Sequence, residues 1–252
     1  NNEMAVELAK VSMWLETLAV DQPLAFLDHH LKIGNSVLGS NIDSLEELAA
    51  TQRRDEDQSG LDDFDEAEQN LMSRLMDIYK EFITIENTDR SNVEDIKEKY
   101  REYEQNDVRK RLKAMANVHA ATFFDRDLGL PSDAIGRMAK ALDSEPDWDE
   151  IEGMNWFEEC QSLAEQEDFF HWQVEFPEVF YDTDGKELEN PGFDVVLGKP
   201  PYLNAWSMSD ELGEERTAIK NRFSPAEESE MELLHGHWDY YMSFILQSLE
   251  VT

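Results

Sequence analysis

The sequence predicts an α/β fold in which part of an open, mainly parallel sheet is interrupted by a long α-helical insertion. The run at 193–197 is β-branched and apolar almost throughout, which is typical of a strand buried on both faces of a parallel sheet. The middle of the chain instead repeats apolar residues at helical spacing and is rich in acidic residues. We therefore expect the first part of an α/β domain at 1–43, the helical insertion at 44–165, and a strand, loop and helix of the same domain at 166–252.

The opening segment is predicted to form an amphipathic helix. Its apolar residues follow a four-three spacing, at Met4, Leu8, Val11, Leu15 and Leu18. Pro23 ends the helical region, because proline has no amide hydrogen and disfavours helix in the residue before it. Residues 33–39 then indicate the edge of a strand followed by a turn.

The region at 44–165 is predicted to be mainly helical. Ser44 and Glu47 fit a capping box, in which both side chains accept hydrogen bonds from free amides at a helix start. Two further runs have helical spacing, at Leu71, Leu75, Ile78, Phe82 and Ile85, and then at Val93, Ile96, Tyr100, Tyr103, Val108, Leu112 and Met115. Consecutive long helices favour an antiparallel hairpin whose apolar residues pack between its arms. Another helix is expected at 133–142.

The last third of the chain carries the strand signals. Within 170–176 the apolar residues Trp172, Val174 and Phe176 alternate with polar ones, which is typical of a half-buried strand. Glycine and proline at 190–192 precede the second strand, at 193–197. Residues 238–249 have the pattern of a further amphipathic helix.

The charge of the chain is strongly acidic, because 57 acidic and 22 basic residues give a formal net charge of −35. Proteins that neutralise DNA phosphates usually carry a basic face, and the densest basic run here is 109–113. That run could contact DNA or form a solvated helix face. In a salt-loving, haloarchaeal host, molar salt would shorten the Debye length to roughly 3 Å and screen the repulsion from DNA. The alternative is an acidic protein that avoids DNA.

Composition excludes several classes of protein. The chain has 252 residues, 40% of them hydrophobic, which is enough for one sizeable core or two small ones. It has neither an apolar run of 18 residues nor a secretory leader, so a cytoplasmic protein without a membrane partner is expected. Cys160 alone cannot form an internal disulfide or a cysteine-rich zinc site. The pairs His29–His30 and His235–His237 lack nearby further ligands, so packing is favoured over metal binding.

The candidate site is the loop after the second predicted strand, Gly198-Lys199-Pro200-Pro201-Tyr202. Open α/β sheets bind ligands at the carboxyl ends of their strands. The two prolines fix the backbone and present carbonyl oxygens, and the tyrosine adds a flat ring. The loop is suited to accept hydrogen bonds and to stack on a planar group, although a simple strand-to-loop turn is the alternative.

Four patches of the sequence, in order, resemble the adenine-specific DNA methyltransferases of type IIG restriction enzymes and BREX-type phage exclusion. They lie at 5–14, 32–36, 170–180 and 198–202, and the last is similar to the family's Asn-Pro-Pro-Tyr motif. The resemblance implies a partial Rossmann-like, S-adenosylmethionine-dependent methyltransferase sheet with a helical insertion. It also implies that the chain is an internal piece of a longer polypeptide, which would supply a cofactor loop before it and a target-recognition region after it.

The resemblance implies roles for the candidate residues. These enzymes flip the target adenine out of double-stranded DNA. Tyr202 would stack on the flipped base, while Pro200, followed by Pro201, would accept a hydrogen bond from the exocyclic amine through its carbonyl. Gly34 and Asn35 match the position that touches the adenine of S-adenosylmethionine, although Asn35 could instead be a simple turn residue.

Lys199 stands where the family has an asparagine. The asparagine oxygen accepts the second hydrogen of the amine, whereas a protonated lysine has no acceptor and opposes the positive charge that develops on nitrogen. We therefore expect little or no methyl transfer with this lysine, and we expect Lys199→Asn to raise it. The alternative function is a non-enzymatic, acidic helical interaction protein.

Overall fold

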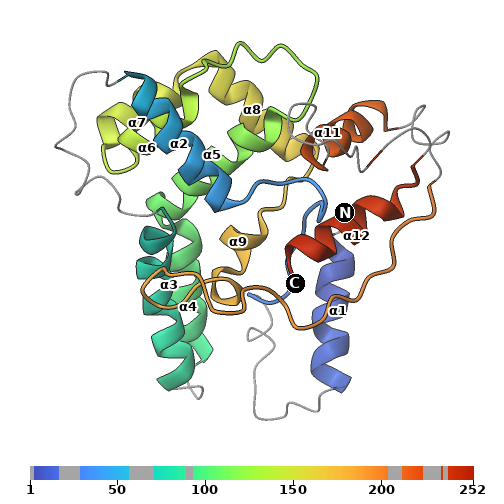
Figure 1. Ribbon diagram of the computed structural model, residues 1–252. Helices are drawn as coiled ribbons and strands as arrows, with labels where there is room; N and C mark the ends of the chain where they lie inside the picture. Colours follow the sequence, from blue (N-terminus) through green and yellow to red (C-terminus); the bar gives the residue numbers. More distant parts are fainter. Residues whose placement is uncertain are drawn as a thin grey trace.

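The structure is a computed structural model that describes residues 3–16, 29–56, 71–88, 93–203, 212–223, 234 and 238–252. These residues form helices joined by loops, as Figure 1 shows. Over the described ranges there is no β-strand, and the β-pairing there consists of two isolated bridges, Asn35 with Phe169 and Tyr181 with Glu187. The predicted α/β fold, with its partial Rossmann-like sheet, is therefore wrong for this structure.

The first two helices lie close to where the sequence predicts them, the first from its helical spacing and the second from a capping box. Helix α1 (Glu3–Glu16) confirms the opening helix, and the predicted break at Pro23 lies outside the described residues. Helix α2 (Ile42–Glu56) begins before the predicted capping box. The cap is Asn41, whose side-chain oxygen accepts a hydrogen bond from the amide of Ser44 at 2.9 Å. Asparagine caps a helix as well as serine does, so its position sets the helix start.

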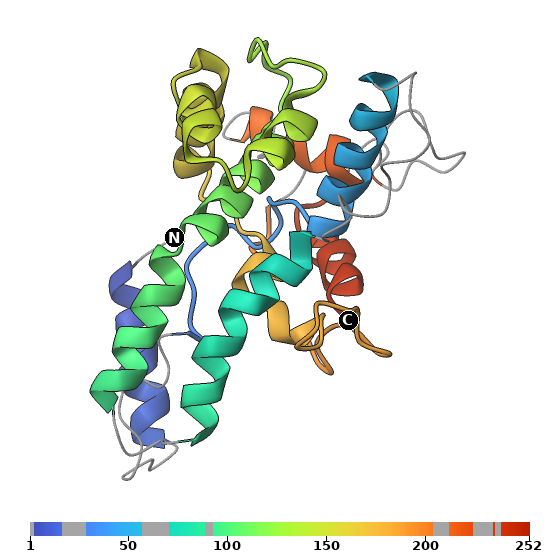
Figure 2. The ribbon, with the colours of Figure 1, turned by 90° about the vertical axis from the view of Figure 1, so that its left-hand side faces the viewer.

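The predicted helical hairpin is confirmed, with one correction. Helices α3 (Leu71–Thr88) and α4 (Val93–Gln105) lie side by side in Figure 1 and in Figure 2. The second arm does not continue unbroken, because a separate helix α5 (Asp107–Ala121) starts after it. Asn106 separates the two, since its side-chain oxygen accepts hydrogen bonds from two amides in the first turn of α5.

Helix α5 is the centre of the structure and contacts α2, α3, α4, α6, α8 and α9. Helix α6 (Ala134–Ala141) confirms the helix predicted at 133–142. Helices α7 (Glu145–Glu152) and α8 (Asn155–Gln166) follow it; almost all of their residues lie in the region 44–165, which is predicted to be mainly helical, although no individual helix is predicted there. The core packed around α5 includes the fully buried side chains of Leu38, Ile42, Leu45, Leu75, Met76, Leu112, Met115, Met138 and Leu142.

The predicted strand at 170–176 is wrong. This part of the chain forms helix α9 (Trp172–Glu175), followed by the 3-10 turn η2 (Pro177–Val179). The amides of Val174 and Glu175 both donate to the carbonyl of His171, at 3.0 and 2.9 Å. A helical turn satisfies its backbone groups locally, whereas a strand needs a paired neighbour. The alternation of apolar and polar residues over this short segment therefore reflects aromatic packing rather than a strand.

The predicted buried strand at 193–197 is also wrong. The segment has no regular structure, and Val195 and Leu197 are 68% and 92% exposed. Its start is anchored by a hydrogen bond of 2.7 Å from the amide of Phe193 to the carbonyl of Val251. An apolar run becomes a buried strand only where other strands pair with it, and the described part of the chain holds none.

The predicted strand edge at 33–39 reduces to one bridge. The amide of Asn35 donates to the carbonyl of Asp168 at 2.6 Å, and the turn that follows is closed by a hydrogen bond from Leu38 to Asn35 at 3.1 Å. The turn is thus confirmed and the strand is not. The segment crosses beside α9, so its residues still meet those of 168–172.

The chain closes with helices α11 (Gly213–Phe223) and α12 (Tyr241–Glu250). Helix α12 confirms the helix predicted at 238–249, although it begins three residues later. Helix α11 has no counterpart among the predicted elements. No helix within the described residues combines the length and apolar character needed to cross a membrane.

The predicted apolar face of α1 is exposed rather than buried. Its exposed residues are Met4, Leu8, Val11 and Leu15, while Leu18 lies outside the described residues. The four-three spacing of these residues therefore predicts the helix correctly, although the apolar face that the spacing defines is exposed.

Candidate functional site

The Pro-Pro-Tyr loop (198–202) lies at the surface. Tyr202 is 92% exposed, Lys199 is exposed, and Pro200 is half-buried. The loop is held at its end, where the amide of Tyr240 donates to the carbonyl of Leu203 at 3.0 Å. The structure thus places these residues in one surface loop with an accessible aromatic ring, and their predicted catalytic and DNA-binding roles stay predictions.

Asn35 is connected to this loop through two residues that the sequence does not single out. Its side-chain nitrogen donates to Oε1 of Glu215 at 2.8 Å, and the same oxygen accepts a hydrogen bond from the hydroxyl of Tyr240 at 2.5 Å. Burial and this bond to Glu215 raise the pKa of Tyr240 above its ordinary value. Because the backbone of Tyr240 bonds Leu203, one chain of hydrogen bonds joins the predicted cofactor residue to the Pro-Pro-Tyr loop.

Gly34 lies against an aromatic ring. A Cβ atom added there would be 2.4 Å from Cδ2 of Phe170, so a side chain at this position would displace the ring. Glycine is therefore required by close approach, and its backbone forms part of a cavity wall. The predicted role of Gly34 in binding the cofactor stays a prediction.

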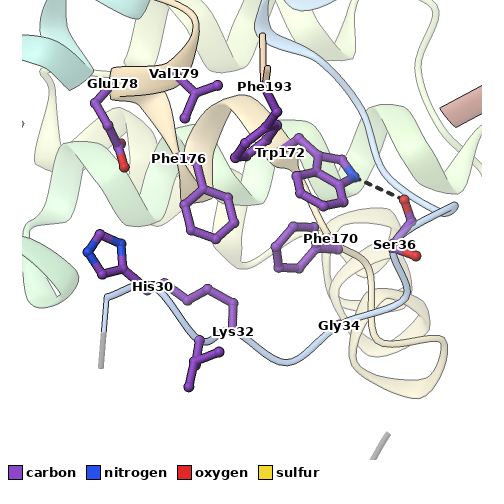
Figure 3. Close-up of a pocket in the computed structure, with 11 residues that line it drawn as sticks. His30, Lys32, Gly34, Ser36, Phe170, Trp172, Phe176, Glu178, Val179 and Phe193 are labelled. Carbon is purple, nitrogen blue, oxygen red and sulfur yellow. Dashed lines mark hydrogen bonds between the residues drawn. The ribbon is translucent and has the colours of Figure 1, made fainter. Parts of the chain in front are cut away.

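The cavity beside Gly34 is here called the aromatic pocket. It has a volume of about 530 Å³ and is lined by the rings of three phenylalanines and one tryptophan together with His30 and aliphatic and charged side chains, as Figure 3 shows. Its walls are formed by His30, Leu31, Lys32, Gly34, Ser36, Phe170, Trp172, Phe176, Glu178, Val179 and Phe193. The segments wrongly predicted as strands thus supply the rings.

The rings of the aromatic pocket hold one another in position. The centroids of Phe170 and Trp172 are 5.0 Å apart, and those of Phe176 and Phe193 are 5.8 Å apart, both nearly edge-to-face. The indole nitrogen of Trp172 donates to the carbonyl of Ser36 at 3.0 Å. These contacts fix the orientation of the wall without a bound ligand.

A buried histidine supports the wall from behind. Nδ1 of His171 accepts the amide hydrogen of Ser40 at 3.0 Å, so Nε2 carries the proton and donates to Oδ1 of Asn117 at 2.8 Å. Burial lowers the pKa of His171 to about 3, with a further lowering from the charge of Lys113. The ring is therefore neutral and bridges α5 to the segment that carries the pocket rings.

Two residues of the basic run at 109–113, Arg109 and Lys113, pair with a buried carboxylate, whereas Lys110 is exposed. Glu175 is buried, and its carboxylate lies 2.9 Å from Arg109, 2.6 Å from Lys113 and 3.7 Å from Lys32. We call these four residues the Glu175 cluster. Burial alone would raise the pKa of Glu175, but the three positive charges, that of Arg109 first, lower it to about 2. Arg109 is therefore a buried partner of a carboxylate, and neither a DNA contact nor part of a solvated face.

Metal binding has little support in the part of the chain described. The rings of His29 and His30 contact each other, with centroids 3.8 Å apart and planes tilted by 44°. Across the described ranges, no group of three or more histidine, cysteine or acidic residues could hold a metal ion. His235 and His237 lie outside those ranges.

Comparison with known protein families identifies the family of the chain. The model of a family described as Eco57I restriction-modification methylase matches residues 1–252. No curated protein matches the chain, and no solved structure matches it.

Proposed function

The chain belongs to the Eco57I restriction-modification methylase family, and from this premise we propose that it methylates the exocyclic amine of adenine in DNA with S-adenosylmethionine as donor. Membership of the family supports a DNA methyltransferase of a restriction-modification system over an acidic interaction protein. The finer assignment, to adenine and to the type IIG or phage-exclusion class, rests on the resemblance of 170–180 and 198–202.

The observation that carries this proposal is the accessible Pro-Pro-Tyr loop. An exposed tyrosine that follows two prolines can stack on a base rotated out of the duplex, a contact worth roughly 1–3 kcal/mol per base. In this proposal Tyr202 stacks on the flipped adenine, and the carbonyl of Pro200 accepts one hydrogen of its amine. Pro201 restricts the backbone, so the two groups keep a fixed relative orientation.

The residues beside Gly34 are compared with the shape and chemistry of the proposed cofactor. S-adenosylmethionine, when bound, supplies an electrophilic methyl group. The wall at Gly34 leaves no room for a side chain, and the adjoining cavity is aromatic, so these residues fit a flat adenine ring. Asn35 would orient this part of the chain toward the Pro-Pro-Tyr loop through Glu215 and Tyr240.

Lys199 limits the proposed reaction. Its side chain is exposed at the surface of the loop. As a donor without an acceptor, it cannot take a hydrogen from the adenine amine. We propose that the loop retains the base-binding geometry while transfer is slow.

The proposed function is tested by incubating the full-length protein that carries this sequence with DNA and S-adenosylmethionine bearing a labelled methyl group. Nucleoside analysis of the digested DNA then identifies the product. Label in N6-methyladenine, increased by Lys199→Asn, supports the proposal. Label in cytosine, or no label in either form of the protein, contradicts it.

A further inference from the structure

We propose that Arg222 is a positioning residue, which holds the turn at 34–38 and the Pro-Pro-Tyr loop at one fixed separation. Its importance for the reaction rests on the proposed function, because methyl transfer requires the donor and the target amine to meet in line. The placement of the two segments follows from contacts within the chain alone.

The guanidinium of Arg222 bridges the turn and helix α12. Its side chain is 10% exposed. Nη1 donates to the carbonyl of Val37 at 2.7 Å and to Oε1 of Gln247 at 2.5 Å, and Nη2 donates to Oε2 of Glu250 at 2.6 Å. The planar fork of an arginine holds several acceptors in fixed directions, so these bonds set the distance from the turn to α12.

Helix α11 carries a second bridge of the same kind. Glu215 accepts hydrogen bonds from Asn35 in the turn and from Tyr240 at the start of α12. Arg222 follows Glu215 by seven residues, or about two helical turns, so both side chains leave the same side of α11. Figure 1 shows α11 above α12, and the two helices contact each other. Two bridges oppose rotation of the turn against α12, which a single bridge would allow.

Helix α12 holds both ends of the segment that contains the Pro-Pro-Tyr loop. At its start, the amide of Tyr240 donates to the carbonyl of Leu203 at 3.0 Å. At its end, the carbonyl of Val251 accepts the amide of Phe193 at 2.7 Å. Between these anchors, residues 194–202 form no hydrogen bond between backbone groups in the part of the chain that the structure describes. The position of the loop therefore follows that of α12.

A shift of the turn against the loop would reach the proposed chemistry. Bringing reacting groups into line contributes strongly to catalysis, and a misplacement of about 1 Å can cost on the order of 10²-fold in rate. The bonds of Arg222 go to the backbone of the turn and to side chains of α12, and not to the Pro-Pro-Tyr loop. Its replacement should therefore disturb alignment more than ligand binding.

Arg222→Lys separates the geometry of the fork from its charge. Lysine keeps a positive charge beside Glu250 but is a point charge that does not reproduce the fork. In the full-length protein with Lys199→Asn, we expect kcat for DNA methylation to fall by about tenfold. KM for S-adenosylmethionine and for DNA should stay within about twofold. Circular dichroism identifies the temperatures at which the variant is folded.

Glu250→Gln tests the same bridge with less disturbance of the fold, because the side chain of Glu250 is 43% exposed. It weakens the bond to Arg222 from the side of α12, so kcat should fall severalfold. Arg126→Lys is the matched control, since Nε of Arg126 also binds a carboxylate of α11, that of Glu214, at 2.8 Å. This control should leave kcat unchanged, and an equal fall of kcat in Arg126→Lys would overturn the proposal.

Hydrogen exchange tests the placement independently of methylation. If Arg222 links the turn to α12, Arg222→Lys should speed exchange severalfold at the amides that anchor the two segments, those of Asn35, Phe193 and Tyr240. Peptide-resolved mass spectrometry of the folded protein measures this exchange. Arg126→Lys should leave it as in the wild type. Unchanged exchange at Phe193 and Tyr240 in Arg222→Lys would overturn the proposal.

The outcomes also distinguish this inference from the proposed function. Faster exchange together with a lower kcat supports both. A wild-type kcat in Arg222→Lys, or a rise in KM alone, overturns the positioning role and leaves the proposed function standing. Faster exchange without methylation by either form at residue 199 supports the placement of the two segments and contradicts the function.

Discussion

Asn35 donates a hydrogen bond to Glu215 across a separation of 180 residues, at 2.8 Å, and thereby ties the turn beside the aromatic pocket to helix α11. Tyr240 donates to the same carboxylate oxygen. The arrangement makes the carboxylate of Glu215 the shared acceptor between the two segments that carry the predicted site residues.

Replacing this acceptor should destabilise the fold. Glu215→Ala leaves the half-buried donor of Asn35 and the buried donor of Tyr240 without their acceptor, which costs about 2–4 kcal/mol. Urea unfolding measures the difference. Glu214→Ala is the control, since Glu214 lies in the same helix turn but forms an exposed ion pair with Arg126, worth about 0–1 kcal/mol. Equal losses in the two variants would contradict the role of Glu215.

The Glu175 cluster should control stability in acid. Because the folded pKa of Glu175 is lowered to about 2, its contribution is fully present above its ordinary pKa of 4.5 and is lost as pH falls toward 2. Glu175→Gln should lower the free energy of unfolding at pH 7 by about 3–5 kcal/mol, as expected when a buried ion pair is broken. The variant should also lose less stability than the wild type between pH 4.5 and 2.5. Glu102→Gln is the control, because Glu102 forms an exposed ion pair with Lys99. This variant should change neither the free energy of unfolding at pH 7 nor its loss between pH 4.5 and 2.5.

His171 should make the protein sensitive to milder acid. Its pKa falls from an ordinary 6.5 to about 3 on folding, so the unfolded chain takes up the proton first. The stability contributed by the neutral ring is present above pH 6.5 and is lost progressively as pH falls toward 3. Chemical denaturation at pH 7.5 and pH 5 should show a larger loss in the wild type than in His171→Gln. His30→Gln is the control, because His30 is exposed, and it should lose as much stability as the wild type. A His171→Gln variant with the full pH dependence of the wild type would refute the role of His171 in acid sensitivity.

Lys199→Asn should raise adenine methylation on the order of 10²-fold or more, because it restores an acceptor for the reacting amine. Lys186→Asn, in another exposed loop, controls for the loss of a positive charge and should have no effect. In the Lys199→Asn background, Tyr202→Ala should reduce turnover, whereas Tyr202→Phe keeps the ring and should retain it. An equally active lysine form would refute the inhibitory role of Lys199.

The acidic surface predicts a response to salt. If the charge is an adaptation to molar salt, the melting temperature should rise as potassium chloride is increased toward that range, because self-repulsion is screened. Thermal unfolding followed by circular dichroism measures this. A melting temperature that falls in molar salt would rule out a salt-loving host.

The sequence predicts the helices well because helical spacing is a local property. The residues that define α3, α6 and α12 lie within a few turns of one another, so their pattern is readable without knowing the rest of the fold. The strands are different, since a strand at 193–197 depends on partners elsewhere in the chain. Its apolar character is visible in the sequence, but its pairing is not.

The candidate site, like the fold, can be predicted from the sequence where it depends on neighbouring residues and not where it depends on distant ones. The Pro-Pro-Tyr loop is contiguous and was identifiable from its residue types. The link from Asn35 to Glu215 and the pairing of Arg109 with Glu175, 66 residues apart, join positions that no spacing rule connects. Gly34 is a candidate from the sequence, but its close contact with Phe170 is visible only in the structure.

The exposed apolar run at 195–197 also bears on self-association. An extended segment with unprotected apolar side chains can template edge-to-edge aggregation between copies. Asp194 and Lys199 flank the run, and charges at such positions act as gatekeepers that oppose stacking. Lys199 thus has an expected role that is separate from the proposed chemistry: Lys199→Asn should leave Asp194 as the one charge directly flanking this apolar run.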